Sequence, residues 1–282
     1  MLAAAAEDPA PRARLLEGLR APRGRAAGGL QDGGARLKVA TWNVNGIRAR
    51  QAQFCEWLER DKPDVVCLQE LKAEPAQVPE QCRVEGYHVF WHGMRAYSGV
   101  SLHIRKELHP TEPVFSHPEF DMETRMVQAQ VGDTVFASVY VPNGGKSYPA
   151  KVEFMKRLAG WAQALRAQGR EVVLCGDINI ALTEMDVHPV ERKPVIGQLP
   201  EERELFRALI GQGLVDVGRK LDPDNERMFS WWPPWRQMRQ KNIGWRLDYV
   251  LASPGVAARA ASCKVLAEVG TSDHAPVMMV TA

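Results

Sequence analysis

The sequence of 282 residues lacks several features that would point to particular protein classes. No apolar stretch is long enough to span a bilayer, so no membrane-embedded segment is expected. The five cysteines include no closely spaced CxxC pair, which argues against a cysteine-ligated zinc site and favours reduced thiols in the cytosol. The net charge is only +2, so an anionic partner has to be recognised by the local arrangement of charge.

What is present is the composition of a globular protein, preceded by a different N-terminal segment. Hydrophobic residues make up 45% of the chain, enough for a sizeable core. Residues 1–36 are mostly Ala, Gly, Arg and Pro, and we expect a disordered tail because they can bury little apolar surface. Their early acids argue against a secretory or transit peptide. We expect one domain over 37–282 and a cytoplasmic location, with a nuclear or organellar one left open.

From residue 37 onward, patterns typical of strands and helices alternate. Apolar residues at helical spacing predict helices over 51–60, 148–168 and 201–210. The third begins at Pro200, a favoured first position, although Leu199 at the cap position has no side-chain acceptor. Strands are expected near 100–104, 127–131 and 135–141, with Gly132-Asp133 as a hairpin turn. The fold class is therefore α/β, with mixed sheets and helices outside them.

Five apolar, strand-like runs each carry a carboxylate, an amide or an imidazole. They span residues 38–45, 64–70, 171–179, 246–251 and 272–280. Five such runs indicate that several strands bring polar ends to one place, as in enzymes built on sheets. Buried carboxylates need partners, and a divalent cation is the usual one for acids and amides without cysteine. The sequence therefore predicts a metal-assisted enzyme.

Two pairs of residues carry much of this prediction. Asn43 and Asn45 are two apart, so they would lie on the same side of a strand and share one ligand. Asp177 and Asn179 repeat this spacing. A structural alternative exists for each acid: Asp177 could form an Asx turn, and the glutamate at the end of residues 64–70 could form an ion pair with a nearby lysine.

A histidine near the end of the chain is the candidate for contacting phosphate. Asp248 offers a carboxylate that could orient the His274 ring and raise its pKa, whereas a lone histidine is more often structural. Tyr140 precedes a Gly-rich turn that contains Asn143, and a phenol and an amide placed there could hold a phosphate.

Seven short motifs, set out below in chain order, resemble those of the exonuclease III-type apurinic/apyrimidinic endonucleases. These enzymes are members of the endonuclease–exonuclease–phosphatase superfamily. The resemblance covers residues 37–280. It implies a deoxyribonuclease-I-like, four-layered α/β sandwich of two packed mixed sheets flanked by helices. The motifs are WNVNG (42–46), LQELK (68–72), YSGV (97–100), YVPN (140–143), CGDIN (175–179), GWRLD (244–248) and SDH (272–274).

The resemblance also implies an activity and site residues. The activity is DNA repair by cleavage of duplex DNA on the 5′ side of an abasic site, dependent on Mg²⁺ or on Mn²⁺ in its place, with 3′–5′ exonuclease or 3′-end-cleaning activity. The implied metal ligands are Glu70, Asn43, Asn45, Asp273, Asp177 and Asn179. The implied catalytic residues are Asp177, Asn179, His274, Asp248 and Tyr140. The implied DNA or phosphate contacts are Asn143, Lys146, Arg48, Lys72 and Tyr97. The proton acceptor is left open among Asp177, His274 and Tyr140.

A tryptophan-rich stretch bears on the substrate. In it, aromatic residues are interleaved with basic ones: Trp231, Trp232, Trp235, Trp245, Arg236, Arg239 and Lys241. This pattern predicts apolar walls beside basic side chains that bind phosphates. The alternative is that the aromatic residues belong to the hydrophobic core. By the resemblance, Trp231, Trp245 and Leu247 form a pocket for an extruded sugar. A baseless sugar is cheaper to extrude than a stacked nucleotide.

The expected partner is therefore double-stranded DNA with abasic or 3′-blocked lesions, bound by a monomer, with no membrane involved. Two alternatives remain from the sequence. One is an enzyme that acts mainly as a 3′–5′ exonuclease or 3′-phosphatase with weak abasic-site cleavage. The other is a DNA-binding relative without catalysis, against which the intact acids and imidazole argue.

Overall fold

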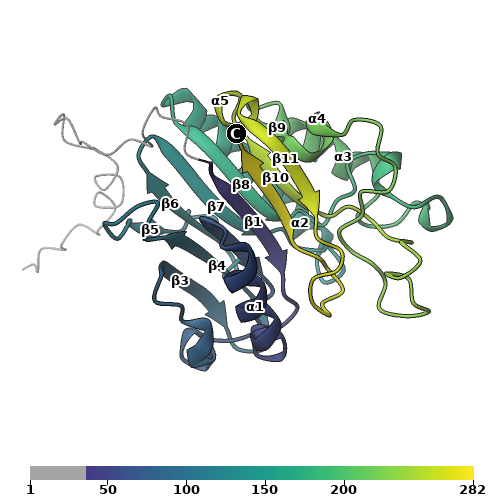
Figure 1. The fold of residues 1–282 in the computed structure, drawn as a ribbon. Coiled ribbons are helices and arrows are strands. Elements are labelled where there is room, and N and C mark those ends of the chain that lie inside the picture. Colours follow the sequence, from purple (N-terminus) through teal and green to yellow (C-terminus); the bar gives the residue numbers. More distant parts are fainter. Residues whose placement is uncertain (1–35) are drawn as a thin grey trace, which may run out of the picture.

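The computed structural model describes residues 36–282, so the prediction for the N-terminal tail falls almost wholly outside the described residues. Two six-stranded sheets form the centre of the molecule (Figure 1). No helix within residues 36–282 is long and apolar enough to cross a membrane.

The first sheet joins both ends of the described chain. Its strand order is β11 (Ala260–Val265), β12 (Val277–Thr281), β1 (Lys38–Asn43), β2 (Val65–Gln69), β4 (Tyr97–Arg105) and β3 (Tyr87–Met94). Strand β1 runs parallel to β2 and antiparallel to β12, so the sheet is mixed, as expected. All five residues of β2 are buried, which fits a strand covered on both faces.

The second sheet is also mixed. Its order is β5 (Phe115–Ser116), β6 (Met126–Val131), β7 (Thr134–Tyr140), β8 (Glu171–Asp177), β10 (Asp248–Ala252) and β9 (Val215–Asp216). Strands β7 and β8 are parallel, and the other pairs are antiparallel. The predicted turn at Gly132-Asp133 joins β6 to β7, with Val131 opposite Thr134.

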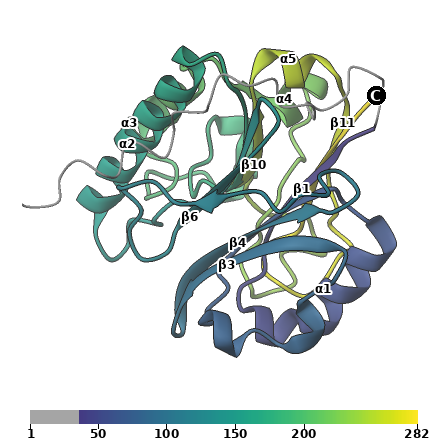
Figure 2. The same cartoon turned by 90° about the vertical axis from the view of Figure 1, so that its left-hand side faces the viewer.

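Helices cover the outer faces of both sheets. Figure 2 shows α2 (Tyr148–Ala167) and α3 (Pro200–Ile210) outside the second sheet and α1 (Ile47–Asp61) outside the first. The predicted four-layered α/β sandwich is thus confirmed. The remaining elements are short: α4 (Val217–Leu221), α5 (Pro254–Ala258) and the 3₁₀ turns η2 (Pro75–Gln77), η3 (Glu80–Cys82), η4 (Glu184–Asp186) and η5 (Pro189–Glu191).

Three apolar cores hold the layers together. Val39, Val65 and Phe136 belong to the core between the two sheets. A second core joins the second sheet to α2 and α3, and a third joins the first sheet to α1. Because α3 has no side-chain cap at Leu199, the Glu202 carboxylate accepts the Leu199 backbone N–H instead, at 3.0 Å.

Candidate active site

The polar ends of both sheets meet at one edge of the sandwich. In the second sheet, Asp177 at the end of β8 is in register with Tyr140 on β7 and with Asp248 on β10. In the first sheet, Glu70 follows β2 directly, and His274 precedes β12. The pocket between them has a volume of about 250 Å³, and its lining is Glu70, Tyr140, Asn143, Asp177, Asn179, Ile196, Gly197, Trp231, Trp245, Leu247, Asp273 and His274.

Four residues at this edge have an unusual backbone conformation. Asn45, Glu70, Lys72 and Asn179 have φ angles of 46°, 51°, 50° and 54°, in the left-handed region that non-glycine residues rarely adopt. Such conformations cost about 1–3 kcal/mol each and cluster at functional sites. The surrounding packing therefore holds these side chains in orientations that relaxed strand ends would not give.

A glycine allows two strands of the second sheet to approach each other closely beside the pocket. Gly176 precedes Asp177 with a φ of 156°, and a Cβ atom there would lie 1.8 Å from the carbonyl oxygen of Val139. Only glycine permits this approach of β7 and β8. The close approach brings Asp177 beside Tyr140.

The Glu70 carboxylate is surrounded by hydrogen-bond donors. Its Oε1 accepts from Asn43 Nδ2 at 3.0 Å and from the Tyr140 hydroxyl at 2.9 Å. Lys72 Nζ lies 2.9 Å from Oε2, so the ion pair considered from the sequence does form. Burial opposes ionisation, but the bonds from Asn43 and Lys72 outweigh it and lower the pKa of Glu70. Glu70 is therefore an anion at neutral pH.

The two asparagines contact different carboxylates, and their sharing of one ligand stays a prediction. Strand β1 ends at Asn43, and the left-handed Asn45 lies beyond it, so the alternation of a strand does not apply. Asn43 Nδ2 contacts Glu70 and Asp177, each at 3.0 Å. Asn45 Nδ2 instead donates to Asp273 Oδ1 at 2.7 Å. Each amide therefore orients different carboxylates.

Asp177 is buried among other acids. Burial, together with the charges of Asp248 and Glu70, raises its pKa to about 7 despite the proximity of His274. Its Oδ1 accepts the Asn179 backbone N–H at 2.8 Å, which is the Asx turn considered from the sequence. Its Oδ2 faces Asn43 and Asn179 Nδ2, the latter at 3.2 Å. The turn fixes the carboxylate without removing it from the pocket.

His274 is held from behind by Asp248. Its Nδ1 lies 2.8 Å from Asp248 Oδ2, and its Nε2 lies 3.8 Å from Asp177 Oδ2. The Ser230 hydroxyl, which sequence reasoning did not identify, donates to the same Asp248 oxygen at 2.6 Å. Burial disfavours the imidazolium, but the charges of Asp248 and Asp177 prevail and raise the pKa of His274 to about 10. Its Nε2 therefore carries a proton that faces the pocket.

The donor set fits a hard divalent cation. Ligating atoms of Glu70, Asp177 and His274 lie within 4.8 Å of one another. Because His274 Nε2 is protonated, the oxygens are the available ligands, and carboxylate oxygens are what Mg²⁺ prefers. The Asp273 carboxylate adds a third acid, and its pKa is lowered because the bonds and charges from His274, Asn45 and Trp231 outweigh burial.

A buried arginine that the sequence did not reveal packs against Tyr140 and Tyr97, two of the residues predicted to contact phosphate. Arg125 is only 2% exposed, and its guanidinium lies 4.7 Å from the Tyr140 ring centre. It donates to the Tyr97 hydroxyl at 2.9 Å, and Lys146 lies over the same Tyr97 ring at 5.2 Å. No motif marked Arg125, because an isolated arginine in a turn has no distinctive pattern.

Three of the predicted pocket residues form one wall. Trp231 and Trp245 meet edge to face, with ring centres 5.4 Å apart, and Leu247 lies beside them in the same apolar cluster. Trp231 also donates from Nε1 to Asp273 Oδ2 at 3.0 Å. The wall is therefore fixed to the acidic end of the pocket.

Trp232 and Arg239 of the same stretch pack and bond within the protein, and for Trp232 the alternative of plain core is the one observed. Trp232 is 1% exposed and belongs to the core. Arg239 lies over the Trp232 ring and donates to backbone carbonyls, including that of Val269 at 2.8 Å. Trp235 is 57% exposed and outside the pocket lining. A pattern of alternating residue types could not separate these environments.

The predicted basic contacts differ in their surroundings. Arg48 is exposed at the start of α1 and donates to the Lys72 carbonyl at 3.3 Å. Lys72 is occupied by Glu70 and by Asn45 Oδ1, the latter at 2.6 Å. Lys146 is exposed and pairs with Glu123 at 3.2 Å. None of these three lines the pocket.

A buried ion pair beneath the pocket was also not predicted. Lys151 of α2 and Glu202 of α3 lie 2.5 Å apart, and each side chain is 1% exposed. Lys151 also donates to the carbonyl oxygens of Asn179 at 2.8 Å and Asn143 at 3.3 Å. This lysine therefore ties the end of β8 to the Gly-rich turn. The signal that could have found it is its place four residues before Met155, on the apolar face of the helix.

Comparison with known proteins places the chain in a family. The Endonuclease/Exonuclease/phosphatase family matches residues 40–274. An exodeoxyribonuclease of Bacillus subtilis is 32% identical over 257 residues, which cover 86% of this chain and 99% of the relative. The structure of an AP endonuclease from Archaeoglobus fulgidus is similar, with a TM-score of 0.78, 30% identity, and coverage of 87% of this chain and 99% of that chain.

A second solved structure is that of a 3′ phosphatase from Neisseria bound to a product DNA hairpin. Its TM-score is 0.79 at 29% identity, with coverage of 87% of this chain and 99% of that chain. The matches span nearly the whole of these relatives and most of the described residues. The chain therefore belongs to the endonuclease/exonuclease/phosphatase family, and within it to the exonuclease III-type apurinic/apyrimidinic endonucleases, which are hydrolases.

Proposed function

We propose that this protein is a DNA repair nuclease that hydrolyses the phosphodiester on the 5′ side of an abasic site in duplex DNA. The single observation that carries the proposal is the shared pocket, which is lined both by Asp177 and His274 and by the apolar wall of Trp231, Trp245 and Leu247. Phosphodiester chemistry and recognition of a bare sugar are thus possible in one place. A metal-dependent mechanism agrees with the family and with the cluster of acids.

Asp177 is the proposed proton acceptor. A pKa of about 7 is suited to a general base at neutral pH, because the carboxylate is both available and basic enough to take a proton from water. Tyr140 is unsuited as a phenolate, since burial and the charge of Glu70 raise its pKa far above the ordinary value. His274 is unsuited because its Nε2 is already protonated at neutral pH.

The remaining groups stabilise charge on the phosphate. His274 Nε2, which Asp248 fixes in place, and the Asn143 amide are the proposed donors to its oxygens, and the Tyr140 hydroxyl joins them when its proton turns from Glu70 to the phosphate. Glu70 and Asp273 are the proposed main ligands of Mg²⁺, or of Mn²⁺ in its place, assisted by Asn43, Asn45, Asp177 and Asn179. When bound, such an ion neutralises negative charge that develops on the phosphate.

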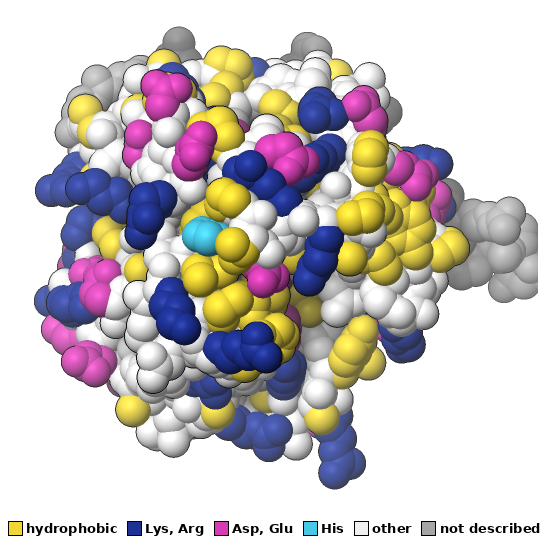
Figure 3. All heavy atoms as spheres, turned by 90° about the vertical axis from the view of Figure 1, so that its right-hand side faces the viewer, with side chains coloured by type: hydrophobic (Ala, Val, Ile, Leu, Met, Phe, Trp, Pro, Cys, Tyr) yellow, Lys and Arg dark blue, Asp and Glu magenta, His cyan; other side chains and the backbone are white. Residues whose placement is uncertain are grey.

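The size of the pocket supports a baseless sugar as the recognised group. A volume of about 250 Å³ lies below the usual range for drug-sized ligands, which favours one sugar over a complete nucleotide. On the face formed by the loops at the right of Figure 1, Lys and Arg side chains are prominent around exposed apolar groups (Figure 3). We propose that this face binds the phosphates of duplex DNA and that the protein acts as a monomer.

The decisive experiment compares two aspartate variants on a labelled abasic duplex, with Mg²⁺ and with chelator. Asp177→Asn is expected to reduce turnover by about 10²–10⁴-fold, as is typical when a general base is lost. Asp133→Asn is the matched control, because that side chain is 89% exposed. Cleavage at the wild-type rate by Asp177→Asn would exclude the assigned role, and retention of the duplex without any nick by the wild type would support a binding protein.

A second candidate keeps the chemistry and changes the substrate to a 3′ end. The similarity to the Neisseria 3′ phosphatase favours it. Rates on abasic, recessed 3′ and 3′-phosphate duplexes, measured side by side, separate the two. The leading proposal requires the abasic duplex to be cleaved fastest.

A further inference from the structure

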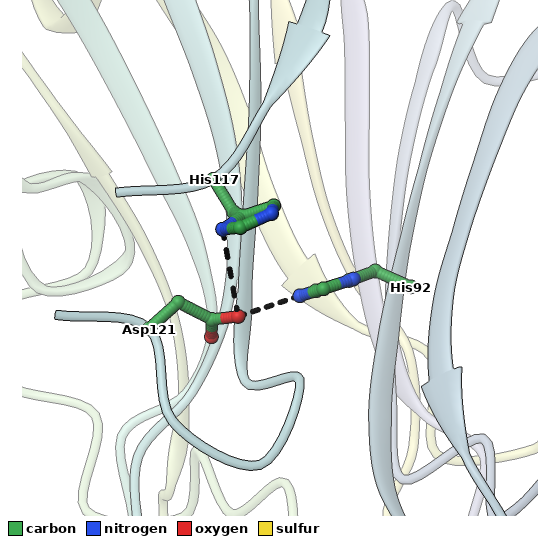
Figure 4. Close-up of side chains that lie close together, drawn as sticks. All are labelled: His92, His117 and Asp121. Carbon is green, nitrogen blue, oxygen red and sulfur yellow. Dashed lines mark hydrogen bonds and ion pairs between the residues drawn. The ribbon is translucent and has the colours of Figure 1, made fainter. Parts of the chain in front are cut away.

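A second group of metal-binding side chains lies outside the pocket described above. His92 comes from β3, and His117 and Asp121 come from the segment between β5 and β6 (Figure 4). The family assignment and the proposed nuclease activity make no use of these residues. None of the three lines the catalytic pocket.

The two imidazoles converge on one carboxylate oxygen. His92 Nε2 lies 2.5 Å from Asp121 Oδ2, and His117 Nδ1 lies 3.9 Å from the same atom. The rings are stacked, with centres 4.8 Å apart and an angle of 11° between their planes. Figure 4 shows His117 and His92 approaching that oxygen from two directions. A simple His–Asp hydrogen bond would not require the second imidazole.

The other oxygen of Asp121 is already used. Its Oδ1 accepts the backbone N–H groups of Arg125 at 2.8 Å and Met126 at 2.9 Å. These bonds fix the carboxylate plane and leave Oδ2 directed at the histidines. Hydrogen bonds that orient a ligating group in this way are typical of metal sites.

The spacing requires only small adjustments to hold an ion. Zinc–ligand bonds of about 2.0–2.2 Å place tetrahedral ligand atoms roughly 3.4 Å apart. The His92 contact would lengthen and the His117 contact would shorten, each by less than about 1 Å. His117 can move readily because its side chain is 52% exposed, whereas lengthening the other contact requires a shift of His92, which is 16% exposed, away from Asp121, which is 6% exposed. A rigid carboxylate and a movable imidazole therefore form an accessible site.

We propose that His92, His117 and Asp121 bind a divalent transition-metal ion such as Zn²⁺, with water completing the coordination. Imidazole nitrogens suit Zn²⁺ and its neighbours, whereas Mg²⁺ prefers oxygen ligands, so this site differs in metal preference from the acidic pocket. The ion would join β3 to the segment that leads into β6. Through Arg125, which bonds to Asp121 by its backbone and to Tyr97 by its side chain, it would stiffen the support of the pocket.

The test is calorimetric titration of tag-free, metal-depleted protein with Zn²⁺ in the presence of excess Mg²⁺. Residues 1–35 contain no histidine or cysteine, so they add no imidazole or thiol ligand. His117→Ala is expected to weaken Zn²⁺ binding by about 100-fold or more, because losing a direct ligand costs at least as much as losing a supporting group. His109→Ala, which removes a histidine outside the cluster, should bind like the wild type.

Co²⁺ provides a second readout, because in the four-coordinate geometry of a zinc site it absorbs visible light far more strongly than the hydrated ion does. This strong absorption should be present in the wild type and in His109→Ala, and absent in His117→Ala and His92→Gln. The proposal would be overturned if His117→Ala bound Zn²⁺ as tightly as the wild type. It would also be overturned if Glu70→Gln, which alters only the acidic pocket, abolished all Zn²⁺ binding. Both readouts are independent of nuclease activity, so failure of one proposal does not decide the other.

Discussion

Replacing Asp248 by asparagine tests the electrostatic reasoning about the pocket. Asp248 accepts from His274 Nδ1 at 2.8 Å and is the leading source of the raised histidine pKa. The change from an ordinary value of about 6.5 to about 10 corresponds to about 5 kcal/mol in favour of the imidazolium. Asparagine keeps the shape and removes the charge. We expect the pKa of His274 to fall towards its ordinary value, since burial opposes the charge and the leading stabilising carboxylate is gone, leaving Asp177 and Asp273.

The consequence for activity has a definite sign. In the wild type, turnover should rise as Asp177 loses its proton near pH 7 and fall only when His274 does so near pH 10. In Asp248→Asn the fall should begin at a lower pH. The ratio of variant to wild-type turnover should therefore decrease as the pH rises, reaching a loss of about 10²–10⁴-fold on the alkaline side.

Two measurements check this expectation. Turnover of an abasic duplex across the pH range gives the ratio, and nitrogen-resolved NMR of the imidazole gives the His274 pKa directly. Asp133→Asn serves again as the exposed control. A ratio that stays constant with pH, or a wild-type His274 that titrates near its ordinary pKa, would refute the reasoning.

Three further predictions follow from other parts of the site. Glu70→Gln should raise the Mg²⁺ concentration for half-maximal activity by about 10-fold or more, measured by metal titration; an unchanged requirement would place the ion elsewhere. Glu202→Gln should destabilise the fold by about 3–5 kcal/mol in urea unfolding, because Lys151 would remain buried without its partner. Trp245→Ala should reduce the preference for abasic over 3′-phosphate substrates, while the exposed Trp235→Ala should not; equal effects would contradict the proposed pocket wall.

The ends of the strands could be predicted from the sequence because an acid or amide after an apolar run is a local signal. Glu70 and Asp177 each follow such a run, and their strands do end at the same edge. The mixed sheets followed from the same runs together with the hairpin turn. The helix bounds differ from the predicted ones by a few residues, because helix ends depend on capping contacts such as that of Glu202 with Leu199.

The rest depended on contacts between distant segments. Nothing local distinguishes Trp232 in the core from Trp231 in the pocket wall, and nothing local shows that Lys151 pairs with Glu202. The left-handed turn at Asn45 likewise depends on its bonds to Lys72 and Asp273, which periodicity cannot reveal. Patterns in the sequence identified the chemical groups, and tertiary packing decided which of them face the pocket.

The position of β12 has a consequence for the synthesis of the protein. This strand is the last in chain order, yet it lies inside the first sheet, between β11 and β1, and His274 directly precedes it. A chain emerging from the ribosome would carry Glu70 and Asp177 long before that strand arrives. The pocket is therefore completed only after residues 272–281 have been synthesised, and a chain that stops before them would lack both His274 and the strand that holds it.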